Sequence, residues 1–209
     1  MPHTEKRTRI VSTFKPATSQ GKGSNDPISL STDGSIVVNM AKLATPRNVY
    51  DADVAWAEQR AHDYVSLFFG KDNIDEPAKL RTRLEIKYGR EAFIGHFWPN
   101  SSEFRATLKS GHSNPTPPEP KSRRVAEKDH SEWANFDFGA KLGSLVSLDF
   151  FLLPPSAAVR LIRGGGSSSL EMTPVLRVNL SISDLLSLYE SCAPIVDKIT
   201  AEEATNHGN

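Results

Sequence analysis

The chain has a single cysteine, Cys192, and no long apolar run. One cysteine excludes an intramolecular disulfide framework and a cysteine-based metal cluster, and a reducing compartment is the simplest interpretation. No apolar run reaches the roughly 20 residues that a membrane-spanning helix needs. We therefore expect an intracellular protein of the cytoplasm, nucleus or an organelle, not secreted and without a membrane partner.

The chain also lacks an excess of either charge. Lysine plus arginine and aspartate plus glutamate number 25 each, so the net charge is zero. A dedicated duplex-DNA binder normally has a strong basic excess, which is absent here. A hydrophobic content of 38% and a charged content of 24% fit an ordinary globular protein that can still have a local basic patch.

Motifs of catalysis and cofactor binding are missing as well. The glycine triplet at 164–166 lacks the Gly-Lys-Ser/Thr ending of a phosphate loop, and no Gly-x-Ser-x-Gly elbow occurs. The six histidines are scattered and show no metal-ligand spacing. We expect no enzymatic activity, no cofactor and no metal.

The most informative segment that is present is KLRTRLEIKY, residues 79–88. Charged and apolar residues alternate strictly along it, which predicts a half-buried strand because successive side chains leave a strand on opposite faces. The charged face is mostly cationic. Same-face residues repeat about every 6.6–7 Å, a spacing comparable to that of phosphates along an extended single strand.

Gly89-Arg90 suits a two-residue type II′ turn, and AFIGHFW, residues 92–98, would return as the second strand of a hairpin. In that register Arg83 faces His96 and Arg81 faces Trp98. Cations beside aromatic rings are typical of a surface that binds single-stranded DNA or RNA. The alternative is a solvated strand face on which Lys and Arg discourage aggregation. The candidate nucleic-acid-binding residues are Lys79, Arg81, Arg83, Lys87, His96 and Trp98.

The remaining pattern predicts an α+β fold of antiparallel sheets with two principal helices packed against them. Residues 52–69 and 183–199 each place apolar residues on one helical stripe. ISLSTDGSIVV (28–38) reads as two short strands around a turn. Further strands are expected at 103–108, 157–162 and 175–182, and one or two buried strands within 133–153. Within the last helix Cys192 lies on the apolar face and is expected to be a small core residue.

The domain organisation follows from composition. Residues 1–27 are polar and basic and are expected to form a flexible arm, and residues 28–199 a single domain. A polar, proline-rich stretch at 109–131 is expected to be a mobile loop, and 200–209 a disordered tail.

Three segments together resemble the Whirly family: LSTDGSIVVNMAKLATPR (30–47), the basic strand, and RVNLSISDLLSLYESCAPIVDKI (177–199). The resemblance implies two strand-rich sheets, each followed by a helix, single-stranded DNA or RNA binding, homotetramers, and a nuclear, plastid or mitochondrial setting. The chain departs from the family in lacking its Lys-Gly-Lys-Ala motif. It also departs in the residues after Tyr50-Asp51, which read as a helix where the family has a strand.

Three functions therefore compete. The first is a non-enzymatic, homo-oligomeric protein that binds single-stranded DNA or RNA through the basic and aromatic hairpin. The second is a structural or assembly protein, for example a viral or multi-subunit component, that acts through protein–protein contacts. The third is an enzyme whose polar pocket the sequence does not reveal.

Overall fold

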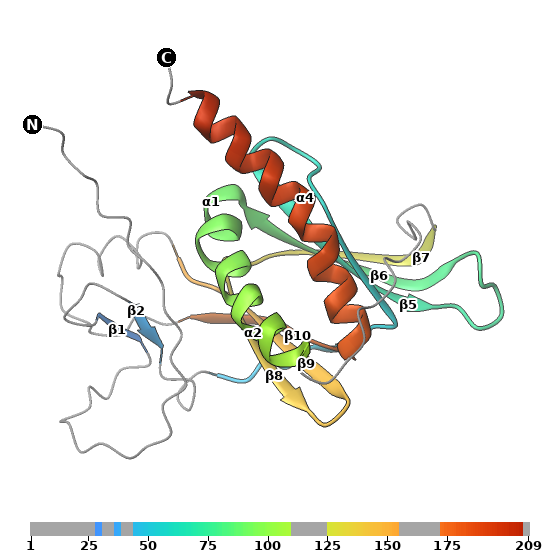
Figure 1. The fold of residues 1–209 in the computed structure, drawn as a ribbon. Coiled ribbons are helices and arrows are strands. Elements are labelled where there is room, and N and C mark those ends of the chain that lie inside the picture. Colours follow the sequence, from blue (N-terminus) through green and yellow to red (C-terminus); the bar gives the residue numbers. More distant parts are fainter. Residues whose placement is uncertain (1–27, 31–35, 39–43, 110–124, 155–171, 207–209) are drawn as a thin grey trace, which may run out of the picture.

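The computed structural model describes residues 28–30, 36–38, 44–109, 125–154 and 172–206. Two four-stranded sheets form its body, a β4–β7 sheet with strand order β4-β5-β6-β7 and a β8–β10 sheet with order β3-β10-β9-β8 (Figure 1). Most neighbouring strands are antiparallel, but β6 and β7 are parallel, as are β3 and β10. Together with the helices these sheets confirm the predicted α+β class.

The chain order explains the topology. The β4–β7 sheet contains β4 (Val54–Glu58), β5 (Tyr64–Asp72), β6 (Leu80–Gly89) and β7 (Ala126–Trp133). The β8–β10 sheet contains β3 (Val49–Asp51), β8 (Phe136–Leu142), β9 (Leu145–Leu152) and β10 (Thr173–Ser181). A separate pair, β1 (Ile28–Leu30) and β2 (Ile36–Val38), is antiparallel, as predicted for 28–38; the expected turn between them lies outside the described residues.

The inner faces of the two sheets share one apolar core. The ring centroid of Phe150 lies 5.7 Å from that of Phe69 and 6.3 Å from that of Tyr88, so β9 packs directly on β5 and β6. Burial of this kind contributes roughly 25 cal/mol per Å² of apolar surface and is the main force that holds the sheets together. Cys192 is fully buried in the same core, as predicted.

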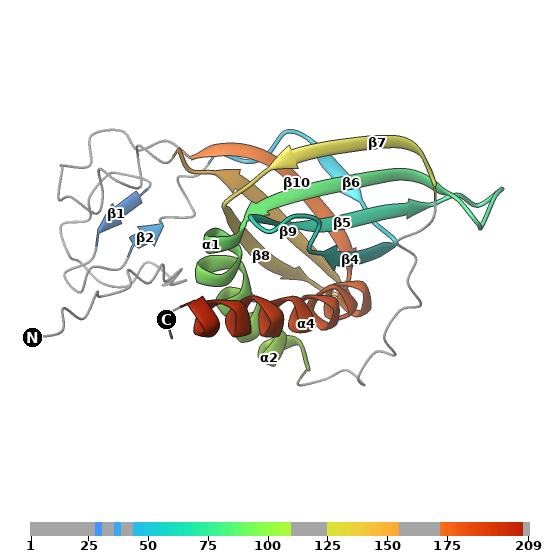
Figure 2. The same ribbon diagram turned by 90° about the horizontal axis from the view of Figure 1, so that it is seen from above.

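Helices lie along one margin of this body. A short helix α1 (Arg90–Ala92) continues into a π-helical segment η2 (Phe93–Phe97) and α2 (Trp98–Lys109), and α4 spans Ile182–Asn206. Figure 2 shows these helices together on the side of the molecule away from β7. An ion pair between Arg105 and Glu190 joins α2 to α4, and the predicted helix at 183–199 is confirmed.

The predicted helix at 52–69 is wrong, because these residues form β4 and most of β5. The two strands have apolar side chains on both faces: Ala55 and Leu67 face the core, whereas Trp56 stacks on Phe68 on the opposite face with centroids 5.1 Å apart. Apolar residues on both faces of a strand blur its two-residue period. In this sequence the blurred pattern also satisfied helical spacing.

Three other expectations need correction. Residues 103–108 belong to α2 rather than to a strand. Residues 126–131 of the expected loop belong to β7, and residues 110–124 lie outside the described part. Helix α4 continues to Asn206, so residues 200–206 are not a disordered tail. The expected arm at 1–27 and the expected strand at 157–162 also lie outside the described residues. The expected strand at 175–182 corresponds to β10, which pairs with β9 and β3.

Candidate nucleic-acid interface

Strand β6 has the two faces that its alternation predicted. Leu84, Ile86 and Tyr88 point into the core and are at most 1% exposed. On the opposite face, Arg83 and Lys87 are half-buried. Arg81 is exposed at an irregularity near the start of the strand, where Leu80 joins Trp56 and Phe68 in an outer apolar cluster. This outer face of the β4–β7 sheet is where the sequence placed its cationic residues.

Most of these cations have a carboxylate partner. The Nε and Nη2 groups of Arg83 donate to the two carboxylate oxygens of Asp129 on β7, at 2.8 and 3.0 Å. Lys79 Nζ lies 2.5 Å from Glu76, and this hydrogen bond raises the pKa of Lys79 above its ordinary value. Arg81 has no such partner among the described residues.

Lys87 lies in a more unusual setting. Its ammonium group is 6.0 Å from the ring centroid of Tyr64 on β5 and 5.9 Å from that of Trp133 on β7. It is also 3.6 Å from Glu85, whose carboxylate accepts hydrogen bonds from two serine hydroxyls at 2.7 and 3.0 Å. Tyr64 on β5, Lys87 on β6 and Trp133 on β7 thus form a row across three neighbouring strands, in which the two rings also contact each other.

Trp133 is the residue of this row that a nucleobase can reach. Half of its surface is exposed, and its indole meets Tyr64 edge-on at a centroid distance of 5.6 Å. The sequence interpretation missed Trp133 because it lies at the end of β7. The available signal was that Trp133 is an aromatic residue at the end of the polar residues 127–132, just before the apolar segment that forms β8.

The predicted second strand of the hairpin is wrong. Residues 93–97 are η2, and Trp98 begins α2. Phe93 and Phe97 stack with centroids 5.4 Å apart, as residues four positions apart do on a helix. The same two apolar positions, with Gly95 between them, also fitted one face of a strand, because short apolar runs do not distinguish the two periods.

His96 and Trp98 are consequently not beside the arginines of β6. The His96 ring is 1% exposed, and Trp98 is half-buried against the core. The candidate set therefore divides. Arg83 and Lys87 lie on the outer face of β6, Arg81 is exposed near its start and Lys79 precedes the strand, whereas His96 and Trp98 lie on the helical segment.

His96 closes the free edge of β8 from the interior. Its Nε2 atom accepts a hydrogen bond from the backbone N–H of Asp137 at 3.2 Å, and its ring stacks on Phe136 at 4.3 Å between centroids. Burial lowers the pKa of His96 to about 4. The imidazole is thus uncharged in the fold at neutral pH, which leaves Nε2 free to accept.

Asp137 extends this buried cluster. The hydroxyl of Tyr88 donates to its carboxyl at 3.1 Å, and burial raises the pKa of Asp137 to about 7. The cluster lies inside the protein against β8, so its observed contacts are structural.

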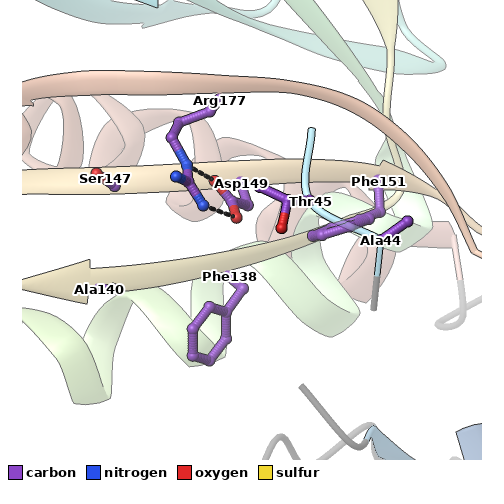
Figure 3. A pocket seen from close by; sticks show the side chains of 8 residues that line it. All are labelled: Ala44, Thr45, Phe138, Ala140, Ser147, Asp149, Phe151 and Arg177. Carbon is purple, nitrogen blue, oxygen red and sulfur yellow. Dashed lines mark hydrogen bonds and ion pairs between the residues drawn. The ribbon is translucent and has the colours of Figure 1, made fainter. Parts of the chain in front are cut away.

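A second feature lies on the outer face of the β8–β10 sheet. A cavity of about 180 Å³ is bounded there by β8, β9, β10 and residues 44–45. Figure 3 shows Arg177 and Asp149 at its floor, joined by two hydrogen bonds of 2.6 and 2.7 Å, with Phe138 and Phe151 nearby. The bidentate pairing raises the pKa of Arg177 and neutralises both charges, so the cavity offers no net charge to a ligand.

Comparison of the chain with protein-family models, curated proteins and solved structures gives no match. The resemblance to the Whirly family thus stays a prediction. Within the described ranges, no group of three or more His, Cys, Asp or Glu side chains is arranged to hold a metal ion. None of the described helices has the length and apolar character needed to cross a membrane.

Proposed function

We propose that the protein binds single-stranded DNA or RNA on the outer face of the β4–β7 sheet. The observation that supports this best is the row Tyr64–Lys87–Trp133, in which a cation lies within about 6 Å of two rings. Bases stack on aromatic side chains whatever their sequence, and neighbouring cations hold the phosphates. Trp133 offers the exposed ring and Lys87 the adjacent charge.

The proposal differs from the hairpin hypothesis in its residues. Trp133 and Tyr64 take the place of Trp98 and His96, which lie elsewhere in the fold. Arg81 remains, because it is exposed near the start of the same strand. Arg83 is a weaker candidate, since Asp129 already occupies its guanidinium.

The carboxylates on this face limit how strongly it can bind. Asp129 pairs with Arg83 at 2.8 Å, and Glu85 lies 3.6 Å from Lys87. We therefore expect few phosphate contacts, with Arg81 and the less closely paired Lys87 as the principal ones. Each phosphate contact on a single strand contributes about −0.7 to the slope of log K against log salt concentration. Two contacts therefore predict a slope of roughly −1.4, much shallower than that of a dedicated duplex-DNA binder.

The stacking part of the proposal is tested by replacing Trp133 and measuring fluorescence anisotropy of labelled oligo-dT and oligo-U. Trp133→Ala should weaken binding by about 1–3 kcal/mol, the range for loss of one stacking ring. Trp133→Phe keeps a ring and should retain most of the affinity. Equal affinity of Trp133→Ala and the unsubstituted protein would remove this face from consideration.

A further inference from the structure

Strand β7 has a long free edge, whereas side chains of the helices contact the edges of β4 and β8. The N–H of Ala57 on β4 donates to Ser191 Oγ of α4 at 2.8 Å, and His96 closes β8. Strand β3 has only three residues. Strand β7 has eight, and no strand among the described residues pairs with its outer edge, which faces away from the helices in Figure 2.

An unpaired edge of this length is a template for another strand. Nearly every residue of β7 is exposed, and the chain places alternating charges there instead of apolar residues. Such charges discourage indiscriminate pairing, but they permit pairing with a strand of complementary charge order.

We propose that β7 pairs antiparallel with β7 of a second copy of this chain, about a two-fold axis at His130. In this register Lys128 lies opposite Glu132 of the second copy, and Glu132 lies opposite its Lys128. On the other face Glu127 lies opposite Trp133, and Asp129 opposite Ser131. The register thus contains two salt-bridge pairs and no pair of like charges. The two β4–β7 sheets become one continuous sheet.

The neighbouring registers are less favourable. Centring the axis on Asp129 or on Lys128 would place that residue opposite itself, which brings like charges together. Centring it on Ser131 would leave Lys128 opposite Ala134. Among these registers, only the one centred on His130 places each copy of Lys128 opposite a carboxylate of the other copy.

The backbone agrees with this register. The N–H of Leu80 donates to the carbonyl of Val125 at 3.0 Å. At the other end of β7 the N–H of Ala134 donates to the carbonyl of Lys87 at 3.0 Å. The register omits the pair of Arg81 and Glu127, so beyond this point the even-numbered residues of β7 bond to β6. The N–H and C=O groups of Asp129 and Ser131 then point to the free edge, and in the His130 register these two residues form the hydrogen-bonded pairs with the second copy.

This dimer does not depend on nucleic-acid binding, and its test uses nuclease-treated full-length protein without oligonucleotide. In sedimentation velocity over a concentration series, the unsubstituted protein should show a monomer–dimer equilibrium. Lys128→Glu and Glu132→Lys should each weaken association about tenfold or more, because each replaces two attractive pairs by two repulsive ones. The double variant Lys128→Glu/Glu132→Lys restores both pairs and should restore the dimer.

Lys141→Glu, on the other sheet, is the matched control and should leave association unchanged. A cross-link test of register is independent of charge. Opposed Cα atoms in a non-hydrogen-bonded antiparallel pair, such as His130 with its own copy, are about 4.5 Å apart, within disulfide range. His130→Cys should therefore form a covalent dimer under mild oxidation, whereas Glu127→Cys should not. A protein that stays monomeric throughout, or a double variant no better than the single ones, would overturn the inference.

Discussion

The stability of Asp137→Asn relative to that of the unsubstituted protein should increase from acid to alkaline pH. The Asp137 carboxyl is buried against β8, and its pKa is raised to about 7. In the unfolded chain an aspartate has a pKa of about 4. Between these values the folded state holds a proton that the unfolded state has released, so the stability of the native protein falls as pH rises from about 4 through about 7.

The magnitude follows from the difference between the two pKa values. One pKa unit corresponds to about 1.4 kcal/mol, so a difference of about three units costs about 4 kcal/mol once Asp137 is fully ionised. Part of this cost is already present at pH 5. The stability of Asp137→Asn minus that of the unsubstituted protein should therefore grow by about 3 kcal/mol between pH 5 and pH 8. For a chain of this size that corresponds to a relative shift of about 6–12 °C in Tm.

Urea unfolding followed by tryptophan fluorescence and circular dichroism, at pH 5, pH 6.5 and pH 8, measures this difference. His96 Nε2 lies 3.4 Å from the Asp137 carboxyl, so the part of the difference that arises above pH 6.5, where His96 is mostly uncharged in both the folded and the unfolded chain, measures Asp137. Asp63→Asn, an exposed position, is the matched control and should show no such trend. A difference that stays constant from pH 5 to pH 8 would refute the buried, protonated carboxyl.

Two further substitutions test how the helices meet the sheets. A Cβ at Gly139 would lie 2.9 Å from Phe104 Cε1, so Gly139→Ala should lower the unfolding free energy by about 1–3 kcal/mol through overpacking. A Cβ at Gly95 would have nothing within 4 Å, so Gly95→Ala should be neutral or slightly stabilising. Thermal melts compare the two variants, and equal effects would contradict the contact between Gly139 and Phe104. Ser191→Ala removes the acceptor for the N–H of Ala57 and should cost about 1–3 kcal/mol in urea unfolding, since a partly buried donor is left unsatisfied; an unchanged midpoint would show that water replaces the hydroxyl.

The sequence was most informative where one face of an element is buried and the other is exposed to solvent. Strand β6 and helix α4 have this character. Strand β6 was predicted to within one residue at each end, and helix α4 at its start but not over residues 200–206. Strands β4 and β5 are buried on both faces and were mistaken for a helix. Strand β7 is exposed on both faces and was mistaken for a loop, since its residues show no apolar alternation.

The candidate site divided for the same reason. The cations of β6 were placed on the correct face because alternation alone determines that face. Their neighbours depend on which distant strands pair with β6, and these are β5 and β7 rather than residues 92–98. Pairing between distant strands, one of them parallel, leaves no local signal, so Tyr64 and Trp133 could not be assigned to the site before the structure.

The salt dependence of binding tests the central claim most directly. Affinity for a labelled, unstructured oligonucleotide is measured by anisotropy across a series of salt concentrations, for the unsubstituted protein, for Arg81→Ala/Lys87→Ala and for the control Lys141→Ala. The loss of two phosphate contacts should flatten the slope of log K against log salt by about 1.4, and the control should leave it unchanged. An identical slope in the double variant, or no binding by the unsubstituted protein at low salt, would contradict nucleic-acid binding by the outer face of the β4–β7 sheet.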